Sequence, residues 1–121
     1  MGAIAMALPY TSESVEKGYE FISQLTGARE GEHHERHKLH GLKNFRIWRQ
    51  HEPVELVIIY IEADDIEKTL DSRRTSDHAF EKWFDSQVVA ITGHHWAEAK
   101  TEPLIDWHHE EGHRHRIPTP S

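Results

Sequence analysis

The amino-acid sequence predicts a small α+β domain with the element order strand, helix, strand, strand, helix and closing strand. Three observations predict it. Residues 56–61 form a continuous apolar run, residues 15–25 and 80–91 carry apolar side chains at helical spacing, and glycines and prolines separate these segments. The chain has 121 residues, a length that fits one domain.

The first third of the chain is expected to hold one strand and one helical region. Residues 3–8 are an apolar run ended by a proline, which predicts a strand. Thr11 or Ser12 is expected to cap the following helix, because a hydroxyl oxygen can accept from the free N–H groups at a helix start. The apolar face of this helix is expected to contain Val15, Tyr19, Ile22 and Leu25. Residues 28–39 can continue as helix until Gly41.

A β-hairpin is expected in the middle of the chain. Residues 45–50 and 56–61 are two strand-like runs, and Pro53 lies in the turn between them. The second run is apolar at every position, whereas a strand with one wet face alternates. Helices can cover one face of this strand. We therefore expect a second copy of the sheet to cover the other face.

Two further helices are expected after the hairpin. Asp64 or Asp65 is expected to cap a short one, and Ser76 or Asp77 a longer one that ends at Gly93. The buried face of the longer helix is expected to consist of Phe80, Phe84, Val88 and Ile91, with Trp83 beside it.

The C-terminal region is polar and rich in histidine. Residues 104–107 are the one later segment that suits a closing strand, and residues 112–121 are expected to form a loose tail. The complete order is that of a ferredoxin-like βαββαβ unit, an antiparallel sheet with helices on one face. We assign residues 1–107 to this domain and residues 108–121 to a His-rich, Pro-containing tail.

The composition excludes several classes of function. The formal net charge is −7, which argues against a nucleic-acid-binding face and against a polybasic membrane contact. The chain has no cysteine, so disulfides, thiolate nucleophiles and cysteine-ligated metals are excluded. No segment has membrane-spanning length and the N-terminal run lacks the basic flank of a secretory signal. We expect a cytoplasmic protein.

The element order, together with particular motifs, resembles the dimeric α/β-barrel superfamily and, within it, a small bacterial family of unknown function. The motifs are Phe-x-x-Trp-Phe at 80–84 and Ile-Thr-Gly at 91–93. The matching segments, which span most of residues 3–96, are 20–29, 45–50, 57–65 and 80–93. The resemblance implies a homodimer with two facing four-stranded sheets, and a pocket between each sheet and its own helices. The superfamily includes cofactor-free monooxygenases, haem-binding and haem-degrading enzymes and stress proteins, so the fold assigns no catalytic residue.

One candidate site combines side chains from the hairpin and from the second long helix. The candidate ligand-binding residues are Trp48, Tyr60, Trp83 and Arg46, because aromatic walls with a few polar groups are typical of small-molecule pockets. The candidate catalytic residues are His78, as a base or haem ligand, and Arg49, as the partner of a carboxylate or enolate. The sequence favours the competing interpretation, that the aromatic residues belong to the core.

A second candidate site is a set of metal ligands on the helical region before Gly41. Its members are Glu30, His33, His37 and His40. The three histidines recur at i, i+4 and i+7 on one face, and two imidazoles at i, i+4 can share a zinc, copper, nickel or iron ion. The metalloprotease motif is excluded, because His34 stands where that motif needs glutamate. A solvated, charged helix face is the interpretation that the sequence favours.

The remaining histidines form a third group that could gather if the tail folds back. They are His94, His95, His108, His109, His113 and His115. Three functions stay open: a homodimeric barrel that binds a small aromatic or apolar ligand, a monooxygenase-like enzyme that uses histidines, or an accessory homodimer without a ligand. The enzyme would work with a divalent transition metal, with haem or without a cofactor.

Overall fold

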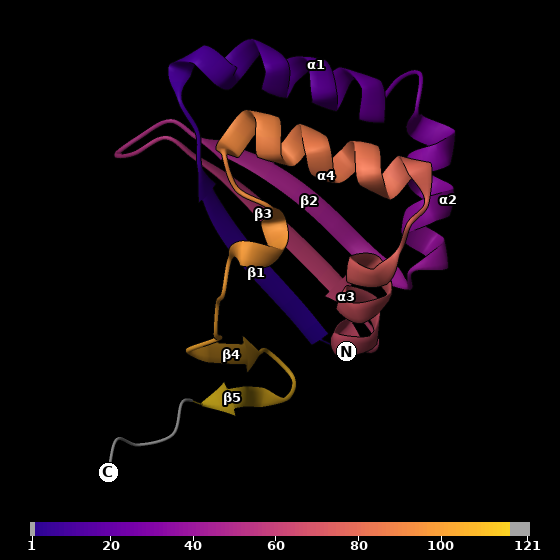
Figure 1. Cartoon of the computed structure of the whole chain (residues 1–121). Helices are drawn as coiled ribbons and strands as arrows, with labels where there is room; N and C mark the ends of the chain where they lie inside the picture. Colours follow the sequence, from indigo (N-terminus) through magenta and orange to yellow (C-terminus); the bar gives the residue numbers. More distant parts are fainter. Residues whose placement is uncertain (1, 117–121) are drawn as a thin grey trace.

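The computed structural model describes residues 2–116 of the chain. It is an α+β fold in which helices cover one face of an antiparallel sheet (Figure 1). The elements in chain order are β1 (Gly2–Pro9), the 3-10 turn η1 (Ser12–Ser14), α1 (Val15–Leu25), α2 (Glu30–Leu39), β2 (Leu42–Gln50), β3 (Leu56–Ala63), α3 (Ile66–Thr75), α4 (Ala79–Thr92), the 3-10 turn η2 (Trp96–Glu98), β4 (Ile105–His108) and β5 (Gly112–Arg116).

The main sheet has the strand order β1-β3-β2, with both pairs antiparallel. The predicted hairpin is confirmed, since β2 and β3 are neighbours. Ile59 of β3 lies opposite Met6 of β1 and Ile47 of β2, and all three side chains face the helices. This arrangement is compatible with a ferredoxin-like unit.

The expected closing strand does not join this sheet. β4 forms close to the expected place, but it pairs with β5 in a separate two-stranded sheet. The loose-tail prediction is therefore wrong for residues 112–116, while residues 117–121 lie outside the described part. Local pairing closes a loop of only a few residues around Gly112, whose φ is 72°, so it costs less chain entropy than pairing with β1. The expected domain boundary at residue 107 falls inside β4.

The helix ends follow the sequence signals in part. Asp65 caps α3 by accepting from the Lys68 N–H at 3.1 Å, and Gly93 ends α4 with a φ of 78°, as predicted. The cap of α4 is His78, whose Nδ1 accepts from the Phe80 N–H at 3.1 Å, so the expectation of Ser76 or Asp77 is wrong. The expected cap of α1 by Thr11 or Ser12 is wrong: Ser12 begins η1, Thr11 precedes it, and the residue before α1 is Ser14, which makes no side-chain cap bond.

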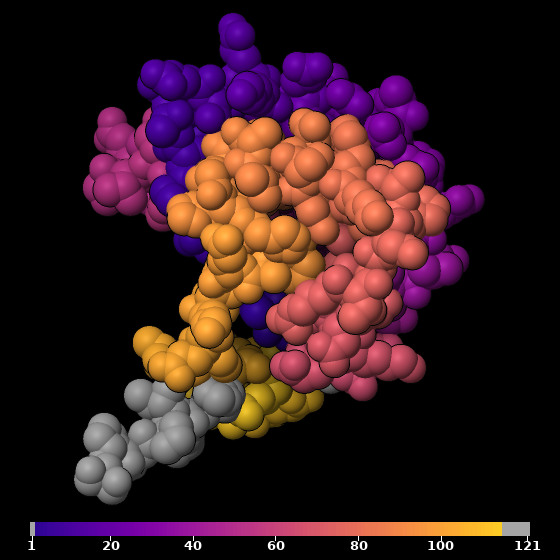
Figure 2. Space-filling model, in the orientation of Figure 1, coloured from indigo at the N-terminus to yellow at the C-terminus, as the bar shows by residue number. Residues whose placement is uncertain are grey.

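The hydrophobic core lies between the sheet and the helices. Figure 2 shows α4 and α3 closing this side of the molecule, with the β4–β5 hairpin at its lower edge. The core contains Met6, Leu8, Phe21, Leu25, Ile59, Ile61, Leu70, Phe80, Phe84, Val88, Ile91 and Trp96. Among the described helices, none is long and apolar enough to cross a membrane.

The described helices leave the opposite face of the sheet uncovered, and this face carries small and apolar side chains together with Arg46 and Glu62. Glu62 lies close enough to Arg114 of β5 to interact with its guanidinium electrostatically. Ala7 of β1, Ile58 of β3 and Trp48 of β2 form one cross-strand row on it, and Trp48 is 49% exposed. Strand β3 is thus apolar on both faces, as the sequence indicated, but within this chain the helices bury only one of them.

Candidate functional site

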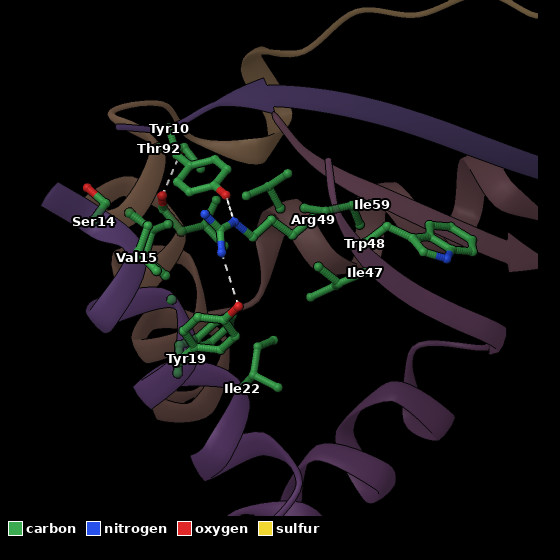
Figure 3. Close-up of a pocket in the computed structure, with 15 residues that line it drawn as sticks. Tyr10, Ser14, Val15, Tyr19, Ile22, Ile47, Trp48, Arg49, Ile59 and Thr92 are labelled. Carbon is green, nitrogen blue, oxygen red and sulfur yellow. Dashed lines mark hydrogen bonds between the residues drawn. The ribbon is translucent and has the colours of Figure 1, made fainter. Parts of the chain in front are cut away.

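An apolar cavity of about 100 Å³ lies between the sheet and α1, with α4 as its third wall (Figure 3). Its apolar lining includes Val15, Ile22, Ile47, Ile59, Val88 and Ile91. The cavity exists partly because Gly18 of α1 has no side chain. A Cβ atom built on Gly18 would meet only Ile91 Cγ2, at 4.0 Å. The cavity lies where the resemblance implied a pocket, between a sheet and its own helices.

Arg49 brings charge to the rim of this cavity. It is the penultimate residue of β2 and lies on the helix-covered face, opposite Val57. Its Nη1 donates a hydrogen bond to Tyr19 Oη at 3.1 Å, and its Nε donates to Tyr10 Oη. Its Nη2 lies 3.4 Å from Glu55 Oε2. Figure 3 shows the guanidinium between the two tyrosine rings.

This arrangement can bind an anionic group next to an apolar one. A guanidinium is permanently charged and donates in a planar fork, which suits a carboxylate, enolate or phenolate. Two hydrogen bonds to tyrosine hydroxyls fix its orientation, and the pair with Glu55 is long and partly exposed. Apolar walls with a few convergent polar groups are typical of small-molecule pockets.

Arg49 is the one residue of the predicted pocket whose side chain takes part in this site. Trp48 contributes to the lining, but its indole points away from the cavity, because successive strand residues face opposite sides (Figure 3). Arg46 and Tyr60 are cross-strand partners on that other face, with the guanidinium 5.8 Å from the ring centre. A hydrogen bond to Glu62, assisted by burial, raises the pKa of Tyr60.

The two α4 residues of the predicted pocket also lie away from the cavity lining. Trp83 packs against Phe21 with ring centres 5.5 Å apart, and the Arg29 guanidinium lies 4.1 Å above its ring. The His78 imidazole is occupied in capping α4. The structure therefore divides the six predicted residues between both faces of the sheet and the N-terminal half of α4.

Sequence reasoning missed Tyr10 and placed Tyr19 in the apolar helix face. Tyr10 is buried directly after the proline that ends β1, whereas Tyr19 is 60% exposed over Arg49. The pairing with Arg49 depends on the approach of α1 to the end of β2, which no sequence pattern reports.

The structure brings together His33 and His37 of the predicted metal site. Their Nε2 atoms are 2.6 Å apart, and both rings pack against Phe45, with ring centres at 5.5 and 4.6 Å. Burial lowers the pKa of His33, with a smaller effect from His34. Burial, then repulsion from His33 and Arg73, lowers the pKa of His37 to about 3. Both imidazoles are neutral at pH 7.

His40 and Glu30 lie apart from this pair. His40 Nε2 is 2.6 Å from Glu81 Oε1, and its Nδ1 is 2.6 Å from Ser72 Oγ. Glu30 is exposed and lines an outer hollow beside His33. Across residues 2–116, no group of three or more histidines and carboxylates has the geometry to hold a metal ion.

Glu81 is the centre of a buried network that joins three helices. Its carboxylate accepts from Arg36 of α2, from Ser76 Oγ at 3.0 Å and, through a 2.6 Å contact, from His40. Burial alone would raise the pKa of Glu81, but these hydrogen bonds outweigh it and lower the pKa to about 2. The network satisfies the charges internally, so we assign it a structural role.

The described histidines of the third group make local contacts. His94 Nδ1 is 2.9 Å from Glu98 Oε2, and His95 caps η2. The rings of His108 and His109 are 4.5 Å apart in the C-terminal hairpin. These contacts leave the group divided between η2 and the hairpin.

Comparisons with known proteins assign no family to this chain. No protein-family model and no curated protein matches the chain. A function for the cavity is therefore inferred from its own residues.

Proposed function

We propose that this protein binds a small aromatic or apolar ligand that carries one anionic group. The apolar cavity with Arg49 at its rim is the observation that supports the proposal. A closed apolar cavity of about 150 Å³ admits benzene. The cavity here is about 100 Å³ and open on one side, so it suits one ring or a short alkyl chain whose polar end remains at the rim.

The anionic end of the ligand is proposed to pair with Arg49. The proposed contact is at Nη2, which now faces Glu55, because Nε donates to Tyr10 and Nη1 donates to Tyr19. A ligand carboxylate or enolate would replace Glu55 there. The tyrosine hydroxyls hold the guanidinium in place, so the Arg49 side chain loses little conformational entropy when the ligand binds.

Two features favour binding over the other functions that the sequence left open. An accessory dimer without a ligand needs no space between sheet and helices, whereas this chain has a cavity there. A histidine-based oxygenase needs an imidazole at the cavity, and His78 caps α4 outside its lining. An enzymatic reaction at Arg49 is compatible with the proposal but is not needed for it.

Sodium benzoate and benzyl alcohol are suitable probes, since they differ mainly in charge. We expect benzoate to shift the methyl resonances of Ile22 and Ile47, and to bind at least about tenfold more tightly than benzyl alcohol because of one charged hydrogen-bonded pair. Arg49→Met should remove this preference.

A larger residue at position 18 tests where the ligand binds. Gly18→Leu should fill the cavity and abolish the benzoate shifts. Gly31→Leu makes the same change at an exposed position of α2 with no atom within 4 Å, and should leave the shifts intact. Equal shifts in both variants, or none in the wild type at millimolar benzoate, would contradict the proposal.

We also propose that two copies of this chain associate through the uncovered sheet face. Ile58, Tyr60 and Trp48 on this face are apolar or aromatic, and the alanines of β1 beside them allow close approach of a second sheet. The charged side chains of this face, Arg46 and Glu62, lie beside Tyr60. An extensive apolar face usually marks an interface. This proposal follows the dimeric α/β-barrel resemblance, and the cysteine-free composition fits action in the cytoplasm.

A further inference from the structure

His33 and His37 present two metal-binding atoms to each other on successive turns of α2. Their Nε2 atoms are 2.6 Å apart and their ring centres 4.0 Å apart. Both rings are partly buried, and Phe45 of β2 packs against both. The two donors are thus held by packing before any ligand arrives, which reduces the ordering cost of binding.

Access to the pair comes from an outer hollow between α2 and the start of β2. The hollow has a volume of about 410 Å³ and is lined by Glu30, His33, His34, His37, Lys43 and Asn44. It is separate from the cavity at Arg49, since the two share no lining residue. An ion could enter here and keep water or a further oxygen ligand on its open side.

We propose that His33 and His37 form a two-imidazole site for a divalent transition-metal ion, with Cu²⁺ expected to bind most tightly because nitrogen donors bind it more tightly than the other divalent first-row ions. At metal–nitrogen distances of about 2.0 Å, neighbouring ligands of a square-planar ion lie about 2.8 Å apart and those of a tetrahedral ion about 3.3 Å apart. Without a metal the two Nε2 atoms are 2.6 Å apart, so they must move apart slightly for both to bind one ion in either geometry. Both rings must also turn, so that their Nε2 lone pairs converge on the ion.

The proton balance of the site is simple. Without metal, one Nε2–H donates to the other Nε2, and each ring is neutral. When the ion binds, the donating ring moves its proton to Nδ1, so both Nε2 lone pairs face the metal and no net proton is released.

Calorimetric titration of the full-length, untagged protein with copper(II) sulfate tests the site. His33→Gln should weaken the tightest Cu²⁺ site by about 10- to 100-fold, because one of its two protein ligands is lost. His34→Gln changes an exposed neighbour on the same helix and should leave that affinity within about twofold. Equal affinities in the two variants would overturn the proposal.

A measurement on the wild type keeps the test independent of how the variants fold. Cu²⁺ is paramagnetic and broadens NMR signals near it. Added at about one-tenth of the protein concentration, it should broaden the amide signals of Leu42 and Phe45 first. First broadening in the hairpin around His108 and His109 would place the tightest site elsewhere and would also overturn the proposal.

Discussion

Two neighbouring stripes of α2 show that hydrogen-bond partners decide whether a buried titratable group is neutral or charged. His33 and His37 lie against aromatic rings, where burial lowers their pKa and keeps them neutral. Arg36 and His40 form the adjacent stripe of the helix, and both make hydrogen bonds to the ionised Glu81 carboxylate. The desolvation is similar in kind, but only Glu81 has hydrogen-bond donors on several sides.

Acid should destabilise the protein through His37 in particular. The folded pKa of about 3 lies below the ordinary 6.5, so the unfolded chain binds the extra proton as the pH falls below 6.5. His37 should then cost about 1.4 kcal/mol of stability per pH unit down to about pH 3. The charged or titratable groups facing it are His33, His40, Arg73 and Glu81.

Urea unfolding between pH 7 and pH 5 measures this slope. Over this range His37→Phe should reduce it by about 1 kcal/mol per pH unit on average, because the unfolded imidazole is only partly protonated near pH 6.5, whereas His34→Gln, at an exposed site, should keep the wild-type slope. An NMR titration in which the His37 ring protonates between pH 6 and pH 7 would refute the prediction.

At the scale of the element, α1 combines a regular apolar face with a gap at its centre. Phe21 and Leu25 are buried, while Gly18 leaves the space that becomes the Arg49 cavity. A glycine inside a helix is unfavourable because it loses more backbone entropy than alanine does on folding. Its presence at this point is consistent with a cavity that serves a ligand.

The same substitution at two glycines should have opposite effects on stability. Gly18→Ala should stabilise the protein by about 0.5 to 1 kcal/mol, because the added Cβ meets Ile91 only at 4.0 Å. Gly41→Ala should destabilise it by about 1 kcal/mol or more, since φ is 84° there and the Cβ would lie 3.2 Å from Thr69 Oγ1. Thermal unfolding of both variants measures the difference, and a shift of the same sign in both would contradict this account.

At the scale of the whole molecule, the sheet has one face in the core and one face that the described helices leave free. Ile59 is 3% exposed among the helices, whereas its neighbour Ile58 points to the other face. Substitutions at these two adjacent isoleucines therefore distinguish folding from association, because a charge at position 59 lies in the core and a charge at position 58 lies on the free face.

Aspartate at these two positions should give different results. Ile58→Asp should dissociate the proposed dimer and leave a folded monomer, since a buried charge without a partner is costly at an interface. Ile59→Asp should unfold the chain, because its side chain lies in the core. Sedimentation velocity with circular dichroism distinguishes these outcomes. A wild-type mass of 14.2 kDa at micromolar concentration would refute the dimer.

Much of the fold was predictable from local patterns in the sequence. The apolar run at 56–61 marked a central strand, and the hairpin paired as expected. Asp65 caps the start of α3 and Gly93 ends α4, as predicted. These features depend on neighbouring residues, through hydrogen bonds to nearby N–H groups or through a φ that glycine adopts easily. The i, i+4 spacing likewise predicted that His33 and His37 would meet.

Only the tertiary structure decided which of these residues share a site. Alternation along β2 puts Arg46 and Trp48 on one face and Arg49 on the other, but which face meets the helices depends on packing. The pairing of Arg49 with Tyr10 and Tyr19, and of β4 with β5, joins elements through contacts that no local pattern contains. Local hydrogen bonding and periodicity are encoded within a few residues, whereas the burial that sets the cavity and the histidine pKa values exists only after the helices have packed on the sheet.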